Sequence, residues 1–218
     1  MAQIFRPRAD AIARAALVGL AIAPVLLVGL GYTIMRSPYV TEQNVTREQP
    51  VPFSHQHHVG QLGIACRYCH TSVEKARFAG IPPTETCMTC HSQIWTNAGM
   101  LAPVRTSLAE NRPLRWRRVH DLPGYVYFDH SVHVTNGVGC STCHGRVDQM
   151  PLVRQAAPLT MGWCLDCHRN PDPALRPREA VFDMARTPPK DQAEAGRVLH
   201  ATYRIDAKNL TDCSICHR

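Results

Sequence analysis

One five-residue motif constrains this chain more than any other feature. Cys-x-x-Cys-His occurs five times in 218 residues and uses all ten cysteines. The copies are Cys66–His70, Cys87–His91, Cys140–His144, Cys164–His168 and Cys213–His217. No cysteine is left for a disulfide or a free thiol, so the fold must be organised around these five points.

This motif is typical of c-type haem attachment. On one helical turn, residues i, i+3 and i+4 share a face. The two thiols can therefore form thioethers with the haem vinyl groups, while the histidine lies beneath the iron. The sequence predicts five covalently bound c-type haems. The attachment residues are Cys66, Cys69, Cys87, Cys90, Cys140, Cys143, Cys164, Cys167, Cys213 and Cys216. The proximal iron ligands are His70, His91, His144, His168 and His217.

Zinc and thiol redox chemistry explain the pattern less well. Paired cysteines form zinc sites, but five pairs cannot all combine into four-cysteine sites, and zinc requires no histidine directly after each pair. Redox dithiols occur as a single Cys-x-x-Cys in a thioredoxin-like βαβ unit. We therefore favour haem over both.

An apolar segment lies close to the N-terminus. Residues 15–35 carry no charge and are long enough for a helix to cross a bilayer core of about 30 Å. Arg6, Arg8 and Arg14 precede the segment, and Arg36 follows it. This excess of positive charge before the segment favours an N-terminus inside the cell and the rest of the chain outside.

A cleaved signal peptide is the alternative for this segment. Ala21–Ala23 resembles a cleavage tripeptide, but Pro24 would directly follow the cut and is poorly placed there. We expect an uncleaved signal-anchor instead. It predicts a cytoplasmic N-terminus over 1–14, a transmembrane helix over 15–36 of the cell inner membrane, and a periplasmic pentahaem domain over 37–218.

The predicted outer domain lacks sustained helical or strand periodicity and holds 15 of the 17 prolines. It is too short to enclose five haems in a large core of side chains. We therefore expect a multihaem cytochrome c with little regular secondary structure. Short α-helices should surround packed haems, almost no sheet should form, and one transmembrane helix should precede the domain.

An internal repeat divides this domain. Residues 53–59 and 128–134 both read Phe-x-His-x-x-His-Val, and they precede the next motif by 13 and 12 positions respectively. Each repeat is followed by a second motif. The pattern predicts two dihaem modules, over about 53–95 and 128–170, and a fifth haem at 213–217.

Seven histidines lie outside the motifs: His55, His57, His58, His120, His130, His133 and His200. A haem with two strong axial ligands transfers electrons and binds no substrate. Histidines at i and i+3 point in neighbouring directions, so each His-x-x-His can reach two adjacent irons. His55, His58, His130 and His133 are thus predicted as distal ligands. His57 beside His58 leaves the choice between those two open.

The fifth distal ligand has two candidates. His120 lies ten residues before His130, with Pro123 and Gly124 between them, and we prefer it slightly. Met161 lies three residues before Cys164, and methionine ligation raises the haem potential. His200 is a less favoured third candidate.

The formal net charge of +7 would suggest an anionic partner. Haem propionates offset this charge, so we expect the mature protein to be near neutral or mildly acidic. Arg112, Arg115, Arg117 and Arg118 form a basic run. Arginine forks suit carboxylates, so we interpret the run as a propionate-pairing or docking surface and expect no nucleic-acid partner.

Several runs are similar to the pentahaem cytochrome c subunit of alternative complex III. They are FSHQHHVGQLGIACRYCHTSVEKARFAGIPPTETCMTCHSQIW from residue 53, RWRRVHDLPGYVYFDHSVHV from 115, APLTMGWCLDCHR from 157 and LTDCSICHR from 210. Together with the N-terminal helix and the five motifs, the resemblance covers nearly the whole chain. It implies a subunit of a bacterial quinol:electron-acceptor oxidoreductase.

That resemblance also implies partners. They are iron–sulfur, integral-membrane quinol-site and monohaem cytochrome subunits, and a soluble electron carrier or a terminal oxidase in a respiratory or photosynthetic chain. The chain would relay electrons without being catalytic alone. One alternative is a self-contained multihaem reductase, which needs an open haem, whereas every motif here ends in histidine. Another is a small tetrahaem quinol dehydrogenase or reductase partner, which five motifs disfavour.

Overall fold

The computed structural model describes residues 6–217. Within this range the chain forms helices, turns and loops, and no β-strand, as the sequence predicts. Three isolated bridges are the only sheet-like pairings there: Thr46 with Arg154, Val126 with His217, and Val138 with Leu175. The chain divides into two compact units, residues 1–43 and 44–218.

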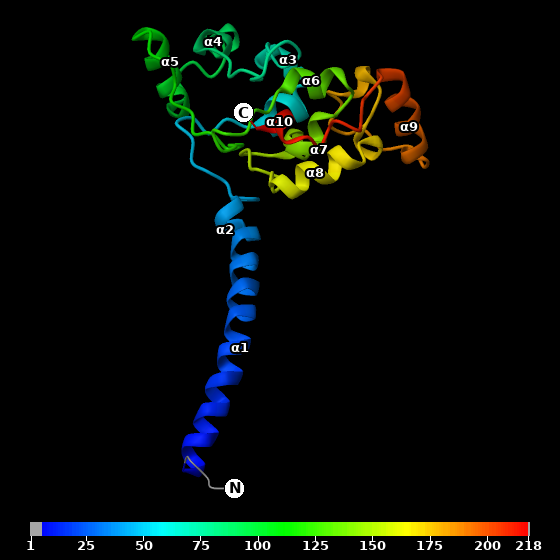
Figure 1. The fold of residues 1–218 in the computed structure, drawn as a ribbon. Helices are drawn as coiled ribbons and strands as arrows, with labels where there is room; N and C mark the ends of the chain where they lie inside the picture. Colours follow the sequence, from blue (N-terminus) through cyan, green and yellow to red (C-terminus); the bar gives the residue numbers. More distant parts are fainter. Residues whose placement is uncertain (1–5, 218) are drawn as a thin grey trace. The chain divides into compact units, whose positions relative to one another are not determined.

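The first unit consists mainly of the long helix α1, Pro7–Arg36, followed by the short α2, Pro38–Thr41 (Figure 1). Proline is favourable at a helix start because its missing N–H would be unpaired there. The helix begins before the predicted apolar segment, and Asp10 and Arg14 form an ion pair one turn apart within this extension. Residues 1–5 of the predicted cytoplasmic N-terminus lie outside the described range.

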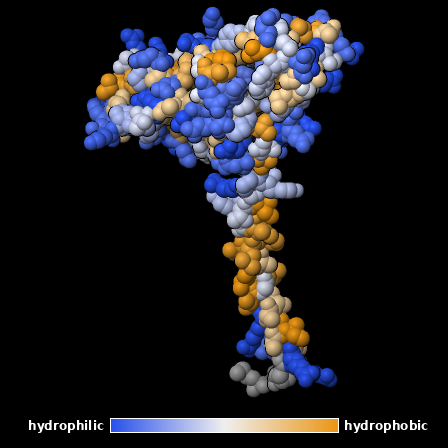
Figure 2. Space-filling view, turned by 180° about the vertical axis from the view of Figure 1, so that it is seen from behind, coloured by the Kyte–Doolittle hydropathy of each residue, from blue (hydrophilic) through white to orange (hydrophobic). Residues whose placement is uncertain are grey.

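Exposed apolar side chains follow α1 beyond its charged first turns, and the face seen in Figure 2 is largely apolar there. It is long and apolar enough to cross a membrane. A helix that is apolar all round requires an apolar environment, so this unit provides the expected candidate for a membrane span.

The second unit places a short helix at every Cys-x-x-Cys-His motif. These helices are α3 (Cys66–Cys69), α4 (Thr84–His91), α7 (Cys140–His144), α8 (Met161–Arg169) and α10 (Cys213–Cys216). The two Phe-x-His-x-x-His segments form the π-helix η1, Gln56–Gln61, and α6, His130–Thr135. The longer connecting helices are α5 (Ala102–Ala109) and α9 (Gln192–Tyr203). The 3-10 turns are η2 (Gly99–Leu101), η3 (Val147–Gln149), η4 (Asp172–Ala174) and η5 (Arg178–Ala180).

Side chains alone supply little core to this unit. Nine hydrophobic residues are buried among those described, and the one cluster of them is Val51, Leu101 and Val104, beside Cys87 of α4. Domains of this size usually bury a much larger apolar interior. The second unit is therefore organised around its motif histidines rather than around a side-chain core.

Buried Arg176 links the third motif to the C-terminal loops by hydrogen bonds. Its guanidinium donates to the Ser141 hydroxyl at 3.1 Å and to the Asp183 carbonyl at 3.1 Å. The guanidinium lies where a Cβ of Gly139 would be, so any other residue directly before α7 would displace this guanidinium. This contact holds the helix that carries His144.

Candidate haem sites

The two Phe-x-His-x-x-His repeats have the same local geometry. The Phe53 ring meets His55 edge-on, with centroids 4.9 Å apart, and stacks on His58 at 4.4 Å. In the second repeat the corresponding distances from Phe128 are 4.8 Å to His130 and 4.4 Å to His133. The phenylalanine therefore fixes two imidazoles in different directions. The repeat in the sequence signals this role, although sequence reasoning assigned the phenylalanines none.

Each paired histidine faces the proximal histidine of a different motif. The ring centroids are 6.5 Å apart for His55 and His70, 6.2 Å for His58 and His91, 6.2 Å for His130 and His144, and 6.0 Å for His133 and His168. Thus η1 serves the first and second motifs, and α6 serves the third and fourth. The structure brings together all four histidines of the two His-x-x-His pairs with four proximal ones.

These separations fit a metal ion between the rings. An imidazole nitrogen lies about 2.0–2.1 Å from a bound first-row metal ion, so two rings that ligate one ion from opposite sides have centroids roughly 6 Å apart. No group of three or more His, Cys, Asp or Glu side chains converges on a common point among residues 6–217. Two opposed ligands suit the axial positions of a haem, whereas tetrahedral zinc needs four ligands.

Hydrogen bonds orient the rings so that Nε2 faces the partner ring. Metal-bound histidines usually donate the other ring N–H to a fixed acceptor. Here Nδ1 lies 2.7 Å from the Gly80 carbonyl for His70 and 2.7 Å from the Leu210 carbonyl for His168. Three of the four distal rings follow the same rule, with Nδ1 bonded to the Ser54 carbonyl for His58, the Arg77 carbonyl for His130 and the Asp129 carbonyl for His133. The Nδ1 of His55 is buried without a hydrogen-bond partner.

His57 and His58 have different surroundings. His58 faces His91, while the Nδ1 of His57 lies 2.8 Å from the Gln61 side-chain oxygen and its ring stacks on Trp95. No proximal histidine stands opposite His57 at the separation of the four pairs. This difference depends on the helix geometry of η1, and the sequence HQHH could not resolve it.

Burial keeps the central histidines in the neutral form that binds metal. Burial, followed by neighbouring histidines, lowers the pKa of His144 to about 3 and the pKa of His55 to about 4. Burial likewise lowers the pKa of His133. Burial and neighbouring cysteines raise the pKa of Cys143 to about 12 and the pKa of Cys140 to about 11. The ionised form of these two cysteines is therefore disfavoured where they lie in this fold.

His120, which the sequence offers as the fifth distal ligand, lies beside the proximal His144 of the third motif. Its Nε2 is 3.2 Å from Nδ1 of His144, and the ring centroids are 4.3 Å apart. That separation is too short for an iron between the rings. His120 instead contacts the outer edge of a proximal ring. The chain does turn through Pro123 and Gly124 as expected, but it delivers His120 to His144 rather than to the fifth motif.

The fifth motif is more exposed than the others. The Nδ1 of His217 lies 3.2 Å from the Tyr125 carbonyl, and α10 is largely exposed. Within the described part of the chain, no histidine ring stands opposite His217 at the separation of the four pairs. His200 is occupied elsewhere, because its two ring nitrogens lie 2.6 Å from an Asp172 oxygen and 3.0 Å from the Ile205 carbonyl. Met161, at the start of α8, is 60% exposed.

Arg77 joins the two modules, a role that no sequence pattern signals. Its guanidinium donates to the carbonyls of Phe128 and Val126, both at 3.0 Å. Its own carbonyl accepts from both Nδ1 and the backbone N–H of His130. The arginine therefore positions a distal histidine of the second module from the loop after the first motif.

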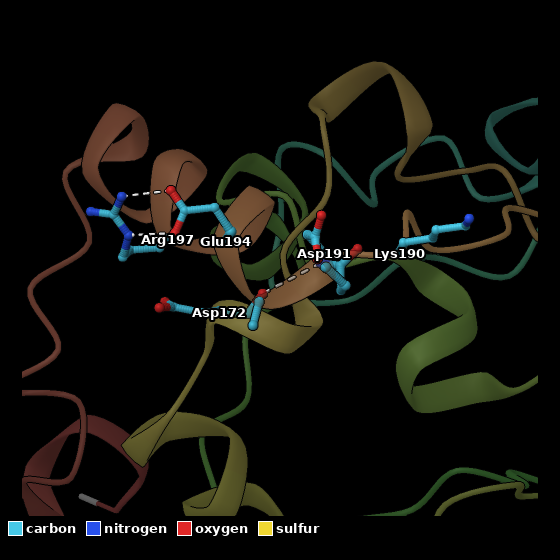
Figure 3. A pocket seen from close by; sticks show the side chains of 7 residues that line it. Asp172, Lys190, Asp191, Glu194 and Arg197 are labelled. Carbon is cyan, nitrogen blue, oxygen red and sulfur yellow. Dashed lines mark hydrogen bonds and ion pairs between the residues drawn. The ribbon is translucent and has the colours of Figure 1, made fainter.

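Two other charged regions lie outside the histidine array. The basic run Arg112, Arg115, Arg117 and Arg118 is exposed, with ion pairs from Arg112 to Glu110 and from Arg118 to Asp121. A surface hollow is lined by residues of η4, α9 and the turn before α9, where Glu194 and Arg197 pair with each other (Figure 3). Its lining includes no motif residue, so it has no direct part in the candidate haem sites.

Two groups of known proteins are similar to parts of this chain. Residues 126–218 match the family described as cytochrome c7 and related cytochrome c. The menaquinone reductase multiheme cytochrome c subunit of Nitratidesulfovibrio vulgaris Hildenborough is 34% identical over 99 residues, which are 45% of this chain and 46% of that protein. The chain thus spans about half the length of the curated relative it matches. The motifs, the fold and these similarities identify a multihaem cytochrome c domain that takes c-type haem.

Proposed function

We propose that this chain is a pentahaem cytochrome c that relays electrons within a membrane quinol-oxidising complex of the alternative complex III kind. The observation that supports it best is the set of four opposed histidine pairs, each with one proximal and one distal ring. An iron held on both sides by imidazole transfers electrons and leaves no position for a substrate. Four of the five predicted sites are therefore suited to electron transfer rather than to catalysis.

When bound, the haems would supply reversible one-electron transfer. The chain's own residues provide covalent attachment through the ten cysteines, axial ligation through the histidine pairs, and rigid ring orientation through Phe53, Phe128 and the Nδ1 hydrogen bonds. We propose His55, His58, His130 and His133 as the distal ligands, matched to His70, His91, His144 and His168 in that order.

The contacts support a linear arrangement of the five haem sites in space. Along this arrangement the motifs follow one another in the order second, first, third, fourth and fifth. His55 and His58 lie one turn apart and so join the first and second motifs, as His130 and His133 join the third and fourth. The first motif reaches the third through Arg67, whose guanidinium lies over the Phe182 ring. The residue before Phe182, Val181, accepts from the backbone N–H of Cys140.

The fifth motif continues the order from the fourth. The Leu210 carbonyl, just before α10, accepts from the Nδ1 of His168 at 2.7 Å. In this order the second and fifth motifs are the two ends, and each would exchange electrons with a partner.

We propose the cell inner membrane as the location, with α1 as a single span and the haem domain in the periplasm. The basic residues at the start of α1 favour a cytoplasmic N-terminus. The proposed partners are iron–sulfur, quinol-site and monohaem cytochrome subunits, together with a periplasmic carrier or a terminal oxidase. A second candidate is supported by the similarity to the menaquinone reductase subunit. In that case the same chain would carry electrons towards a quinone.

Purification from native membranes tests the function. The tagged chain should copurify with integral-membrane and iron–sulfur subunits, and the assembly should reduce a cytochrome c acceptor with a quinol donor. The purified chain alone should show no such turnover. Copurification with a complex that reduces quinone but cannot oxidise quinol would favour the second candidate. A chain that purifies without membrane subunits, or that turns over quinol alone, would contradict both.

We propose Met161 as the fifth distal ligand in place of His120, whose Nε2 is engaged by His144. The oxidised holo-chain should then show the weak charge-transfer band of methionine-ligated ferric haem, and Met161→Leu should remove it. Met100→Leu is the matched control, because Met100 is also exposed, at 52%. The ligand assignment fails if the band is absent from the native chain or persists in Met161→Leu.

A further inference from the structure

The proximal histidine of the third motif differs from the other four in its hydrogen-bond partner. For His70, His91, His168 and His217, Nδ1 lies against a backbone carbonyl, that of Gly80, Ile94, Leu210 and Tyr125 respectively. For His144 the partner is a side chain, the Nε2 of His120 at 3.2 Å. The two modules repeat each other closely in the packing of phenylalanine on their distal rings, yet their proximal rings differ at this point.

The chemistry of this contact follows from the ligand role of His144. Once Nε2 of a neutral imidazole binds a metal ion, Nδ1 must carry the hydrogen and can only donate. His120 must then accept through Nε2 and carry its own hydrogen on Nδ1. The rings are steeply inclined, at 71°, which lets the N–H of one ring point at the nitrogen lone pair of the other.

Nothing else in the described structure competes for this donor. His120 approaches from the segment between α5 and α6, which is far in sequence from α7. On its other side the His144 ring faces the parallel ring of His130, with centroids 6.2 Å apart and 10° between their planes. His144 thus has one ring nitrogen towards His120 and the other side of the ring towards the proposed iron position.

We infer that His120 is a positioning residue that sets the reduction potential of the haem held by His144. The inference rests on the proposed function, because it assumes a haem at the third motif. An imidazole nitrogen is a more basic acceptor than a peptide carbonyl. Donation to it gives His144 more imidazolate character, which makes it a stronger ligand for ferric iron. The haem at the middle of the proposed order should therefore have a lower potential than a carbonyl-bonded ligand would give.

Matched substitutions of His120 test this in the full-length holo-chain. His120→Leu removes the acceptor at similar volume and should shift one of the five potentials upward, leaving the other four unchanged. His120→Gln restores an acceptor oxygen, so it should move that potential most of the way back. His200→Leu is the control, because His200 bonds to Asp172 and Ile205 rather than to a motif histidine. Redox titration followed by electron paramagnetic resonance resolves the reduction potentials of the individual haems.

Unchanged potentials in His120→Leu, or equal shifts in His120→Leu and His120→Gln, would overturn the inference. A second measurement avoids mutation altogether. In the reduced native protein, whose low-spin ferrous irons are diamagnetic, ¹⁵N-labelled histidine should give a scalar coupling across the hydrogen bond between Nδ1 of His144 and Nε2 of His120. A resolved His144 Nδ1–H signal without that coupling would also overturn it.

These outcomes are distinct from failure of the proposed function. If intact mass shows no haem on the third motif, the proposed electron-transfer role fails and the inference has no basis. If mass shows five haems and the potentials do not respond to His120, the electron-transfer role stands and only the inference fails.

Discussion

Replacing Cys140 and Cys143 with serine is expected to abolish electron transfer through the holo-complex, although four of the five attachment motifs remain intact. In the proposed order, the third motif lies between two pairs of motifs. The first and second motifs are on one side, and the fourth and fifth motifs are on the other. Tunnelling rates fall exponentially with distance, so a missing central member should lower turnover by orders of magnitude rather than by a fifth.

The measurement combines intact mass with rapid mixing. Mass should show four haems, and mixing with the electron donor should quickly reduce only those on one side of the gap. The double variant Cys213→Ser/Cys216→Ser is the matched control, because it also leaves four haems but removes an end of the series. In that control all four remaining haems should still equilibrate with one another. Near-normal turnover in the Cys140/Cys143 variant would reject the linear order.

Replacing His58 with alanine is expected to create one new carbon monoxide binding site per chain, whereas His57→Ala should create none. His58 faces His91 with ring centroids 6.2 Å apart, so its loss would leave one side of that iron open. His57 is bonded to Gln61 and stacked on Trp95. The two residues are neighbours in η1, so any general disturbance of this helix should affect both variants alike.

Optical titration of the reduced holo-chain with carbon monoxide gives the number of carbon monoxide molecules bound per chain. The number bound by the native protein is then subtracted. Stoichiometric binding in His57→Ala, with none in His58→Ala, would reverse the ligand assignment. Equal binding in both variants would mean that the local helix fails rather than that one ligand is lost.

The general character of this fold follows from its sequence. Five motifs that use every cysteine, with many prolines between them, predicted a multihaem cytochrome domain of short helices and loops, and the structure confirms that class. The His-x-x-His repeat also indicated which histidines would be grouped, because i and i+3 spacing is a local property of one helical turn. The uncharged segment 15–35 lies within α1, and the helix extends further towards the N-terminus than the uncharged residues do.

What the sequence could not predict depends on contacts between distant segments. His120 was a reasonable candidate ligand because it is a spare histidine near the second module. Its actual neighbour, His144, is set by the path of the loop between α5 and α6. Likewise, nothing in the residues around Arg77 indicates that its carbonyl and guanidinium bind three groups more than 45 positions away.

The Arg77 junction makes the second module dependent on the first. His130 takes both its ring and its backbone hydrogen bonds from the Arg77 carbonyl, so the second module can set this distal ring only once the loop after the first motif is in place. The carbonyls for His168 and His217 come from Leu210 and Tyr125, which brings the C-terminus back onto the entrance of the second module. The distal ring of the third site therefore depends on the first module, whereas the proximal ring of the fourth site depends on the later C-terminal segment. A chain stopped after residue 95 would contain the residues of one whole pair of sites, whereas the second module would still need segments on both sides of it.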